Sequence, residues 1–288
     1  MTPIERELNF EGPSPILYLV STPIGNLKEA SPRMIEVVSS CDYVACEDTR
    51  NSGKLLSLLG LSKPLISCHE HNEEAASDKV VALLKEGKKV CYMSDAGYPA
   101  ISDPGARLVA RCLKEGIKVS VTSGPSAAIN ALVCSGLDST HFYFAGFLPP
   151  KENEKTAELN DLAKRSETLI FYEAPHRIIR TLISMAATLG DRKAVIAREL
   201  TKAHEEFVRG SLSELALLDE ETLKGEMVIV VEGAKTQKEE MSDSEIAHAL
   251  KQELDWGKSP KEAIAATAKN NGLPKNRVYA VYLQAFAD

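Results

Sequence analysis

The stretch SDAGYPAISDPG, residues 94–105, decides the fold of this chain. It contains a glycine turn and then a helix start, and it follows directly on an apolar strand. Residues 89–93, KVCYM, read as a buried strand, and Gly97 then lets the backbone turn so that its amides become available to a ligand. Asp103 and Pro104 predict a helix start, with Asp103 as the N-cap and Pro104 as the first helical residue. A loop held between a strand end and a helix start is where open α/β sheets bind small molecules.

Around this stretch, apolar runs alternate with segments of helical spacing, which is typical of a parallel sheet covered by helices. Four of the expected helices have a proline just inside their start, at residues 32, 104, 125 and 175. We therefore expect the loops before these helices to gather at one edge of a sheet. The expected strands are 16–20, 43–46, 65–67, 90–93 and 119–121, and the expected helices are 32–39, 52–59, 72–86, 104–115 and 125–134.

A second α/β unit follows, with strand-like runs at 142–145, 168–172, 194–197, 206–209 and 227–231. After Gly233 a polar linker leads into two or three helices. We therefore expect an N-terminal tail over residues 1–14, an α/β domain over 15–138, a second α/β domain over 139–233 and a helical appendage over 234–288.

Composition narrows the class of protein. The chain has 288 residues, of which 44% are hydrophobic, and it has neither an apolar leader at its N-terminus nor the ~20-residue apolar run of a membrane span. Six cysteines lack the spacing of a zinc site, and the His69 and His71 pair completes no metal-ligand set, so no metal is expected. We expect a soluble cytoplasmic protein with reduced thiols and no membrane contact.

The net charge of −7 argues against nonspecific coating of nucleic acid but leaves room for a local basic surface. Residues 256–287 contain five basic side chains and one acid, and tyrosines lie among them. This composition resembles a helix-turn-helix-like RNA-binding appendage, although an amphipathic tail packed on the core or at a dimer seam remains open. The expected RNA-binding residues are Lys258, Lys261, Lys269, Lys275, Arg277 and, unless it forms a structural ion pair, Arg50.

Two further turns follow apolar strands, at residues 21–27 (STPIGNL) and 122–128 (TSGPSAA). Neither is a dinucleotide-binding fingerprint, because GxGxxG is absent. Alone, the first reads as a tight structural turn and the second as a capped helix start. Beside the 94–105 loop, we expect both to become walls of the same pocket.

These segments together resemble the tetrapyrrole-methylase superfamily, and within it the branch that methylates cytidine 2′-oxygens in small-subunit (16S) ribosomal RNA. The resemblance runs in order from about residue 15 to 233. The motifs that carry it are 21–27, 47–50 (EDTR), 94–105, 123–127 (SGPSA), 172–177 (YEAPHR) and 198–202 (RELTK).

The resemblance implies two α/β domains of the class III methyltransferase type plus the helical appendage, with S-adenosyl-L-methionine bound in the cleft between the domains, and a homodimer. It places cofactor contacts on Pro23, Ile24, Gly25, Asp95, Tyr98, Ser126, Ala127, Glu226 and Met227. Turns typical of members that act on tetrapyrroles are missing here, which favours the RNA branch.

Methylation of a ribose hydroxyl is helped by a group that accepts or screens its proton. Glu173 is the expected acceptor or orienter, and Arg177 and Lys202 are expected to contact phosphate or ribose. His176 completes this catalytic set. Alternatively, His176 is a residue at the start of a helix whose side chain is hydrogen-bonded to the backbone.

The leading hypothesis is thus an rRNA (cytidine-2′-O)-methyltransferase that acts on ribosomal RNA or on the assembled small subunit. One alternative is methylation of a tetrapyrrole or another small molecule with the same cofactor. A second alternative is a noncatalytic RNA-binding assembly factor that keeps the fold.

Overall fold

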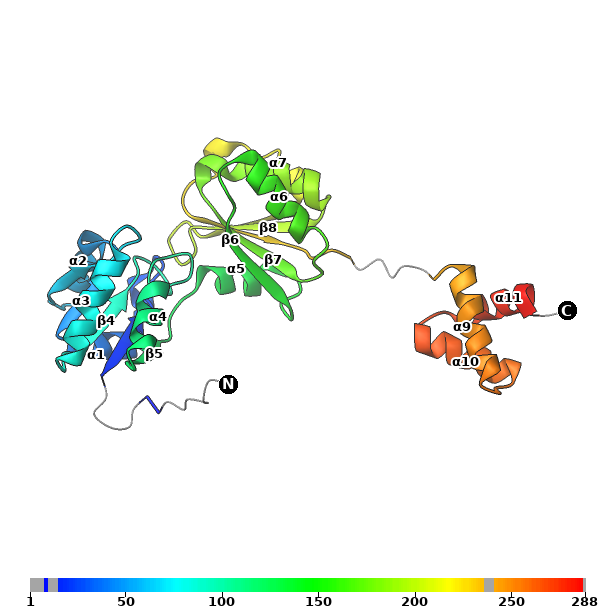
Figure 1. The fold of residues 1–288 in the computed structure, drawn as a ribbon. Coiled ribbons are helices and arrows are strands. Elements are labelled where there is room, and N and C mark those ends of the chain that lie inside the picture. The colour runs from blue at the N-terminus through cyan, green and yellow to red at the C-terminus, as the bar shows by residue number, and fades with distance from the viewer. Residues whose placement is uncertain (1–7, 10–14, 236–240, 287–288) are drawn as a thin grey trace. The chain divides into compact units, whose positions relative to one another are not determined.

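The computed structural model describes residues 8–9, 15–235 and 241–286. The expected N-terminal tail and the middle of the expected linker lie mostly outside the described residues. The chain divides into two compact units, Met1–Ala234 and Lys235–Asp288 (Figure 1). The first unit contains two five-stranded sheets, and the second is helical.

The first sheet is wholly parallel, with strand order β3-β2-β4-β1-β5, as the alternating pattern predicts. Parallel strands need a helical crossover between them, and the intervening segments supply it. The elements are β1 (Ile16–Val20), α1 (Pro32–Ser40), β2 (Tyr43–Cys46), α2 (Thr49–Leu58), β3 (Leu65–Ser67), α3 (Glu73–Lys85), β4 (Val90–Met93), α4 (Ala106–Lys114) and β5 (Lys118–Thr122), with a 3-10 turn η1 at Leu27–Glu29.

Both faces of this sheet are buried. On β4, Val90 and Tyr92 belong to one apolar cluster, which includes residues of α3 and α4, whereas Cys91 and Met93 belong to another, which includes residues of α1 and α2. A strand buried on both faces is continuously apolar rather than alternating. The central position of β4 fixes where the 94–105 loop begins.

Of the proline-led helix starts, Ser31 and Pro32 behave as predicted, with the Ser31 hydroxyl accepting from the Met34 amide. The same prediction for Pro104 and Pro125 is wrong, because both prolines stay in the preceding loops. α4 begins at Ala106 and α5 (Ala127–Ser135) begins after Ser126. The two loops are therefore longer than the sequence pattern suggests.

The second sheet is mixed, with order β6-β7-β10-β8-β9; β6 and β7 are parallel and the other pairs are antiparallel. The strands confirm the five expected runs. The elements are β6 (Phe142–Phe147), α6 (Glu152–Leu162), β7 (Thr168–Glu173), η2 (Pro175–Arg177), α7 (Ile178–Leu189), β8 (Lys193–Arg198), β9 (Glu206–Ser211), α8 (Leu212–Leu215), η3 (Glu220–Thr222) and β10 (Met227–Val231).

Helix α5 packs on this second sheet. Ala131 and Leu132 share an apolar cluster with Val195, Val228 and residues of β7, while α6, α7 and α8 contribute to the cluster on the other face. Figure 1 shows α5 beneath the second sheet. The helix that follows the last strand of the first sheet thus joins the two halves of the first unit.

The helical unit consists of α9 (Asp243–Asp255), α10 (Pro260–Asn271) and α11 (Lys275–Phe286). Ser242 with Glu245 and Ser259 with Glu262 form capping boxes at the first two helices, and Gly272 ends α10 in the left-handed conformation. A small apolar core that includes Ile246, Leu250, Ala263, Val278 and Val281 holds the three helices together. Within the described ranges, no helix combines the length and apolarity needed to cross a membrane.

Candidate functional site

Three loops meet where strands β1, β4 and β5 end. Thr22, after β1, exchanges two backbone hydrogen bonds with Gly97, at 2.9 and 3.1 Å. Gly124, after β5, donates its N–H to the hydroxyl of Tyr98 at 3.2 Å. A Cβ at Gly124 would lie 2.5 Å from the Ser21 hydroxyl, so only glycine permits this approach. The three segments that the sequence placed around one pocket are in contact.

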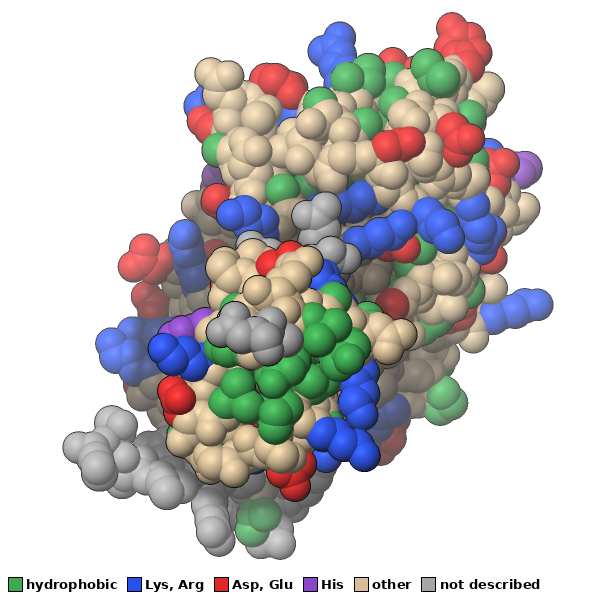
Figure 2. Space-filling view, turned by 90° about the vertical axis from the view of Figure 1, so that its right-hand side faces the viewer, with side chains coloured by type: hydrophobic (Ala, Val, Ile, Leu, Met, Phe, Trp, Pro, Cys, Tyr) green, Lys and Arg blue, Asp and Glu red, His purple; other side chains and the backbone are tan. Residues whose placement is uncertain are grey.

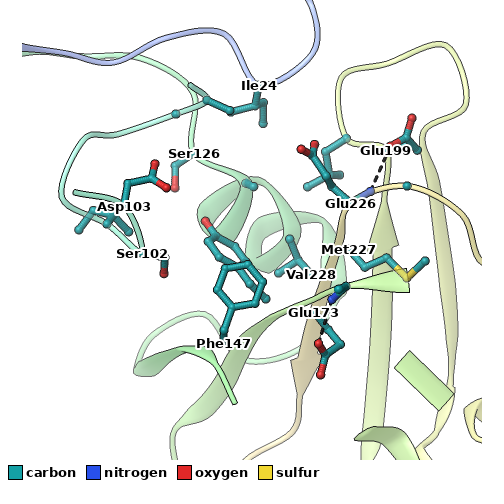
Figure 3. A pocket seen from close by; sticks show the side chains of 18 of the residues that line it. Ile24, Ser102, Asp103, Ser126, Phe147, Glu173, Glu199, Glu226, Met227 and Val228 are labelled. Atoms are coloured by element: carbon teal, nitrogen blue, oxygen red, sulfur yellow. Dashed lines mark hydrogen bonds between the residues drawn. The ribbon is translucent and has the colours of Figure 1, made fainter. Parts of the chain in front are cut away.

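A cavity of about 590 Å³ lies between these loops and the strand ends of the second sheet (Figure 3). Its volume is that of a site for a drug-sized ligand. Phe147 and Tyr172 line it with aromatic rings whose centroids are 5.5 Å apart. Carboxylates from both halves of the unit, Asp103 and Glu226 among them, also line it.

Backbone strain is concentrated on the two sides of this cavity. In the loop after β4, Ala100 and Ser102 have φ values of 67° and 60°, and in the turn after β8, Glu199 and Thr201 have φ values of 50° and 67°. Residues with a side chain adopt this conformation at a cost, and such strain is concentrated at functional sites. Its location here supports a binding function for the cavity.

The start of α4 differs from the sequence expectation. Asp103 does not cap the helix; Gly105 occupies the N-cap position, with φ 129°. The buried carboxylate of Glu73, in α3, accepts hydrogen bonds from the amides of Gly105, Arg107 and Leu108 at 2.9, 3.1 and 3.4 Å. Glu73 thus does the capping that the sequence assigned to Asp103.

The side chain of Asp103 is turned to the cavity instead, with its carboxylate directed toward Ser126 (Figure 3). Burial raises the pKa of Asp103 to about 7, and the nearby carboxylates of Glu47 and Asp95 add to the increase. A carboxylate with a pKa near neutrality can take up and release a proton under physiological conditions. Asp103 is therefore suited to general-base chemistry.

On the opposite wall, the ammonium group of Lys202 donates to Glu199 and Glu226, both at 3.0 Å. Burial acts to lower the pKa of Lys202, but these hydrogen bonds outweigh it and the pKa is raised. Lys202 therefore stays protonated. Its stem packs on the first loop, since a Cβ at Gly25 would lie 2.5 Å from its Cγ, and a Cβ at Gly225 would overlap Glu199.

Of the expected catalytic residues, Glu173 and Lys202 line the cavity, whereas Arg177 and His176 do not. Glu173 is buried, and its carboxylate accepts from the Ala174 amide at 2.9 Å and from the Thr181 hydroxyl at 2.5 Å. Arg177 lies 3.4 Å from that carboxylate and donates to the carbonyls of residues 148 and 149. His176 is exposed and does not line the cavity.

The residues expected to contact the cofactor divide into two groups. Pro23, Gly25 and Asp95 belong to the loops around the cavity but do not line it; Asp95 accepts a hydrogen bond from Asn51 at 2.6 Å. The six that line the cavity are Ile24, Tyr98, Ser126, Ala127, Glu226 and Met227.

The basic residues expected to bind RNA differ in whether their side chains already contact other groups of the protein. Arg50 is tied to Asp48 at 2.6 Å, although its side chain is 88% exposed. Lys258 pairs with Glu253, and Arg277 donates to the Met241 carbonyl at 2.7 Å. Lys261, Lys269 and Lys275 are exposed.

Sequence analysis did not select three cavity-lining residues, Asp103, Phe147 and Tyr172. Asp103 was assigned to a helix cap, and Phe147 lies two residues beyond the end of the expected strand 142–145. Tyr172 lies in a motif that the analysis did use, at the end of a strand that precedes a loop. That position was the available signal, because strand ends supply site residues in α/β sheets.

Sequence comparison finds relatives along almost the whole chain. A Bacillus subtilis (strain 168) protein named ribosomal RNA small subunit methyltransferase I is 43% identical over 97% of this chain and 98% of its own length. Proteins with the same name from Synechocystis and from Escherichia coli O157:H7 are 40% and 42% identical, over 95% and 93% of this chain and over 99% and 94% of their own lengths.

Structure comparison finds the same fold in tetrapyrrole enzymes. Uroporphyrin-III C-methyltransferase from Thermus thermophilus superposes with a TM-score of 0.53 and 20% identity, over 75% of this chain and 94% of that one. A cobalt precorrin-4 methyltransferase gives a TM-score of 0.56 and 18% identity, over the same shares. The expected class III methyltransferase fold is confirmed.

The cavity fits S-adenosyl-L-methionine, the methyl donor that a methyltransferase of this class uses. That molecule is a sulfonium cation with an aromatic base, and the cavity offers aromatic rings, carboxylates and glycine-lined backbone. A Cβ at Gly97 would meet Ile24 and the Pro125 carbonyl, at 3.4 and 3.7 Å, so the loop backbones approach closely there. Ile24, Tyr98, Ser126 and Met227 line the cavity from these loops and from the start of β10.

The family model described as Tetrapyrrole (Corrin/Porphyrin) Methylases matches residues 16–216. This range contains the whole first sheet and every strand of the second except β10. The model thus covers well over half of the chain, and the sequence relatives extend the likeness through the helical unit. The chain belongs to the tetrapyrrole methylase family.

Proposed function

We propose that this methyltransferase transfers a methyl group from S-adenosyl-L-methionine to the ribose 2′-oxygen of a cytidine in small-subunit (16S) ribosomal RNA. The observation that carries the proposal is the identity of 40–43% over 93–97% of the chain to proteins named ribosomal RNA small subunit methyltransferase I. The choice of cytidine and of the 2′-oxygen follows the resemblance of the motifs.

The helical unit supports an RNA substrate rather than a tetrapyrrole. The tetrapyrrole enzymes match 75% of this chain, whereas the relatives named for ribosomal RNA match up to 97% of it. A match over 97% of the chain includes most of residues 235–288. The relatives named for ribosomal RNA thus share the helical unit, in which residues 256–287 contain five basic side chains and one acid.

When bound, S-adenosyl-L-methionine supplies an electrophilic methyl group and a thioether leaving group. The loops after β1, β4 and β5 hold the donor, and the open side of the cavity admits the acceptor nucleotide. Alignment of the acceptor oxygen is the main task of the protein in such a transfer.

Asp103 accepts the proton that the 2′-hydroxyl loses as its oxygen forms the new C–O bond, and then releases that proton to water. Its support is its place in the cavity wall and a pKa raised to about 7, first by burial. General-base assistance of this kind contributes about 10²- to 10⁴-fold.

Of the residues expected to act in catalysis, Glu173 and Arg177 take positioning roles, because their contacts hold β7, η2 and the turn after β6 together. Lys202 keeps Glu199 and Glu226 in place as a protonated group. The exposed His176 is left to contact RNA outside the cavity.

The homodimer and the cytoplasmic location are also part of the proposal. Apolar side chains on β5 and α5 support a subunit interface: Val121, Ile129 and Val133 are 50%, 42% and 66% exposed. Ile129 and Val133 lie four positions apart and so share one helix face. A Val133→Glu variant that runs as a monomer in analytical ultracentrifugation, beside a dimeric wild type, is the expected result.

The proposed reaction is tested by incubating the purified protein with methyl-labelled S-adenosyl-L-methionine and unmethylated 16S RNA, free or in small subunits. Label in a nuclease-resistant dinucleotide that contains cytidine is expected. Label that appears only in a tetrapyrrole acceptor, or no label with intact cofactor binding, would favour the small-molecule enzyme or the assembly factor respectively.

A further inference from the structure

The helical unit carries a groove of about 330 Å³ between α10 and α11. Its walls combine apolar and basic side chains, with Ile264 and Tyr279 on the one hand and Lys261 and Lys275 on the other. In Figure 2, apolar side chains gather on the surface of the helical unit, with Lys and Arg side chains beside them. The groove is distinct from the cavity of the first unit.

The ring of Tyr279 at this groove lies outside the apolar core of the unit. Val278 and Val281 face that core and are buried, whereas Tyr279, on the outer side of α11, is 50% exposed. Tyr282 also lines the groove, but it is half-buried, packs against the core and stacks on Phe286, with centroids 5.9 Å apart and an interplanar angle of 27°. An exposed aromatic ring such as that of Tyr279 is what a nucleic-acid base stacks on.

The charges around the groove are positive and available. Among the described residues, neither Lys261 nor Lys275 forms an ion pair, and both are exposed. The one acid of this region, Glu262, accepts from the amide and the hydroxyl of Ser259, at 3.0 and 2.7 Å, and is occupied as a helix cap. The other acids of the described unit lie on α9.

We infer that this groove binds an unstacked base of single-stranded RNA, which stacks on Tyr279 while Lys261 and Lys275 contact the flanking phosphates. The inference rests on the proposed RNA substrate and adds to it a second contact, outside the cavity where methyl transfer takes place. Bases can be splayed out in this way only from single strands, loops and bulges, so the groove selects unpaired RNA.

A second copy of the chain is a poorer occupant of the groove. A twofold contact would place the same surface on both sides and would bring Lys261 and Lys275 of two copies together. Like charges at an interface oppose association, whereas a phosphate backbone is attracted to them.

The test is fluorescence anisotropy with the full-length protein and a labelled 12-nucleotide single-stranded RNA, without S-adenosyl-L-methionine, with the matching duplex as comparison. Tyr279→Ala is expected to weaken binding to the single strand about 5- to 100-fold, the range for one base stacked on an aromatic ring. Tyr279→Phe keeps the ring face and should bind like the wild type.

The double variant K261Q/K275Q should lower the slope of log affinity against log salt by about 1.4, or about 0.7 for each phosphate contact to a single strand. Lys251→Gln, on α9, removes a charge from the same unit away from the groove and should leave both affinity and slope unchanged. Circular dichroism confirms that each variant is folded.

Wild-type affinity in Tyr279→Ala and an unchanged slope in the double variant would overturn the inference. A change of oligomeric state in Tyr279→Ala without a change in RNA affinity would also overturn it, and would assign the groove to a second copy. Because binding is measured without methyl transfer, a failure of the proposed reaction shows separately, as absence of label in ribosomal RNA.

Discussion

The carboxylate of Glu73 in α3 accepts a hydrogen bond from the backbone amide of Gly105 at 2.9 Å, so α4 is capped by a residue 32 positions earlier in the chain. A buried carboxylate at a helix N-terminus meets both the unpaired amides and the positive end of the helix dipole. The contact leaves Asp103, two residues before Gly105, free to face the cavity.

Glu73→Ala removes this cap and leaves the three amides it serves without their acceptor. We expect a loss of about 2 kcal/mol in the free energy of unfolding, measured by urea denaturation. Glu73→Gln keeps an acceptor oxygen and should lose less. Equal stability of the wild type and the alanine variant would show that the contact does not hold the loop.

Asp103→Asn should lower the rate of methyl transfer by about 10²- to 10⁴-fold, because the amide cannot accept the proton. Since only the ionised carboxylate is a base, the wild-type single-turnover rate should rise with pH through about 7 and level off above it. The variant should lose this rise. Calorimetry should find its affinity for S-adenosyl-L-methionine within a few fold of the wild type, and a retained pH profile would exclude Asp103 as the base.

Asp103→Asn should also stabilise the fold relative to the wild type at alkaline pH. The folded pKa of Asp103, about 7, lies above its ordinary value of 3.8, so the folded state holds this proton more tightly than the unfolded state does. The contribution of this proton to the stability of the wild type is complete below about pH 4 and is lost as pH rises through about 7. The gain in Tm of Asp103→Asn over the wild type is therefore expected to be larger at pH 8 than at pH 5.

Glu173→Gln separates positioning from proton transfer. The amide still accepts from Ala174 or Thr181 but weakens the contact with Arg177. We expect a loss of stability, a moderate loss of rate and an unchanged pH profile. Disappearance of the pH-dependent rise in this variant, with the rise retained in Asp103→Asn, would return the role of base to Glu173.

Gly25→Ala should disturb the donor site, because the added Cβ would lie 2.5 Å from the Cγ of Lys202, at a backbone φ of +155°. Overpacking of this kind costs about 1–3 kcal/mol in the free energy of unfolding, and the displaced loop should also bind S-adenosyl-L-methionine more weakly. Gly60→Ala is the control: its φ is +72° but nothing lies within 4 Å of the new Cβ. Calorimetry should find that the control loses stability but keeps its affinity.

The strands and the parallel first sheet could be predicted from the sequence, because their signal is local. Residues 90–93 form a continuous apolar run, and such a run bounded by turns predicts a strand buried on both faces. The convergence of the loops could be predicted for a related reason, since the ends of parallel strands lie at one edge of the sheet.

The direction of Asp103 could not be predicted, because it depends on a contact distant in the sequence. Locally, Asp103 followed by Pro104 is a good cap, and only the presence of Glu73 at the amides of α4 makes that cap unnecessary. The same holds for Glu173, whose neighbours Thr181 and Arg177 are brought to it by the packing of α7 on the second sheet. Side-chain roles of this kind require the tertiary structure.

Methyl incorporation into 16S RNA by the wild type and by Asp103→Asn, followed by nuclease mapping and mass spectrometry of the labelled nucleoside, tests the central claim most directly. We predict 2′-O-methylcytidine at one position with the wild type and a rate lower by about 10²-fold or more with the variant. Methylation of a base, or no incorporation into either free RNA or small subunits by a protein that binds S-adenosyl-L-methionine, would contradict it.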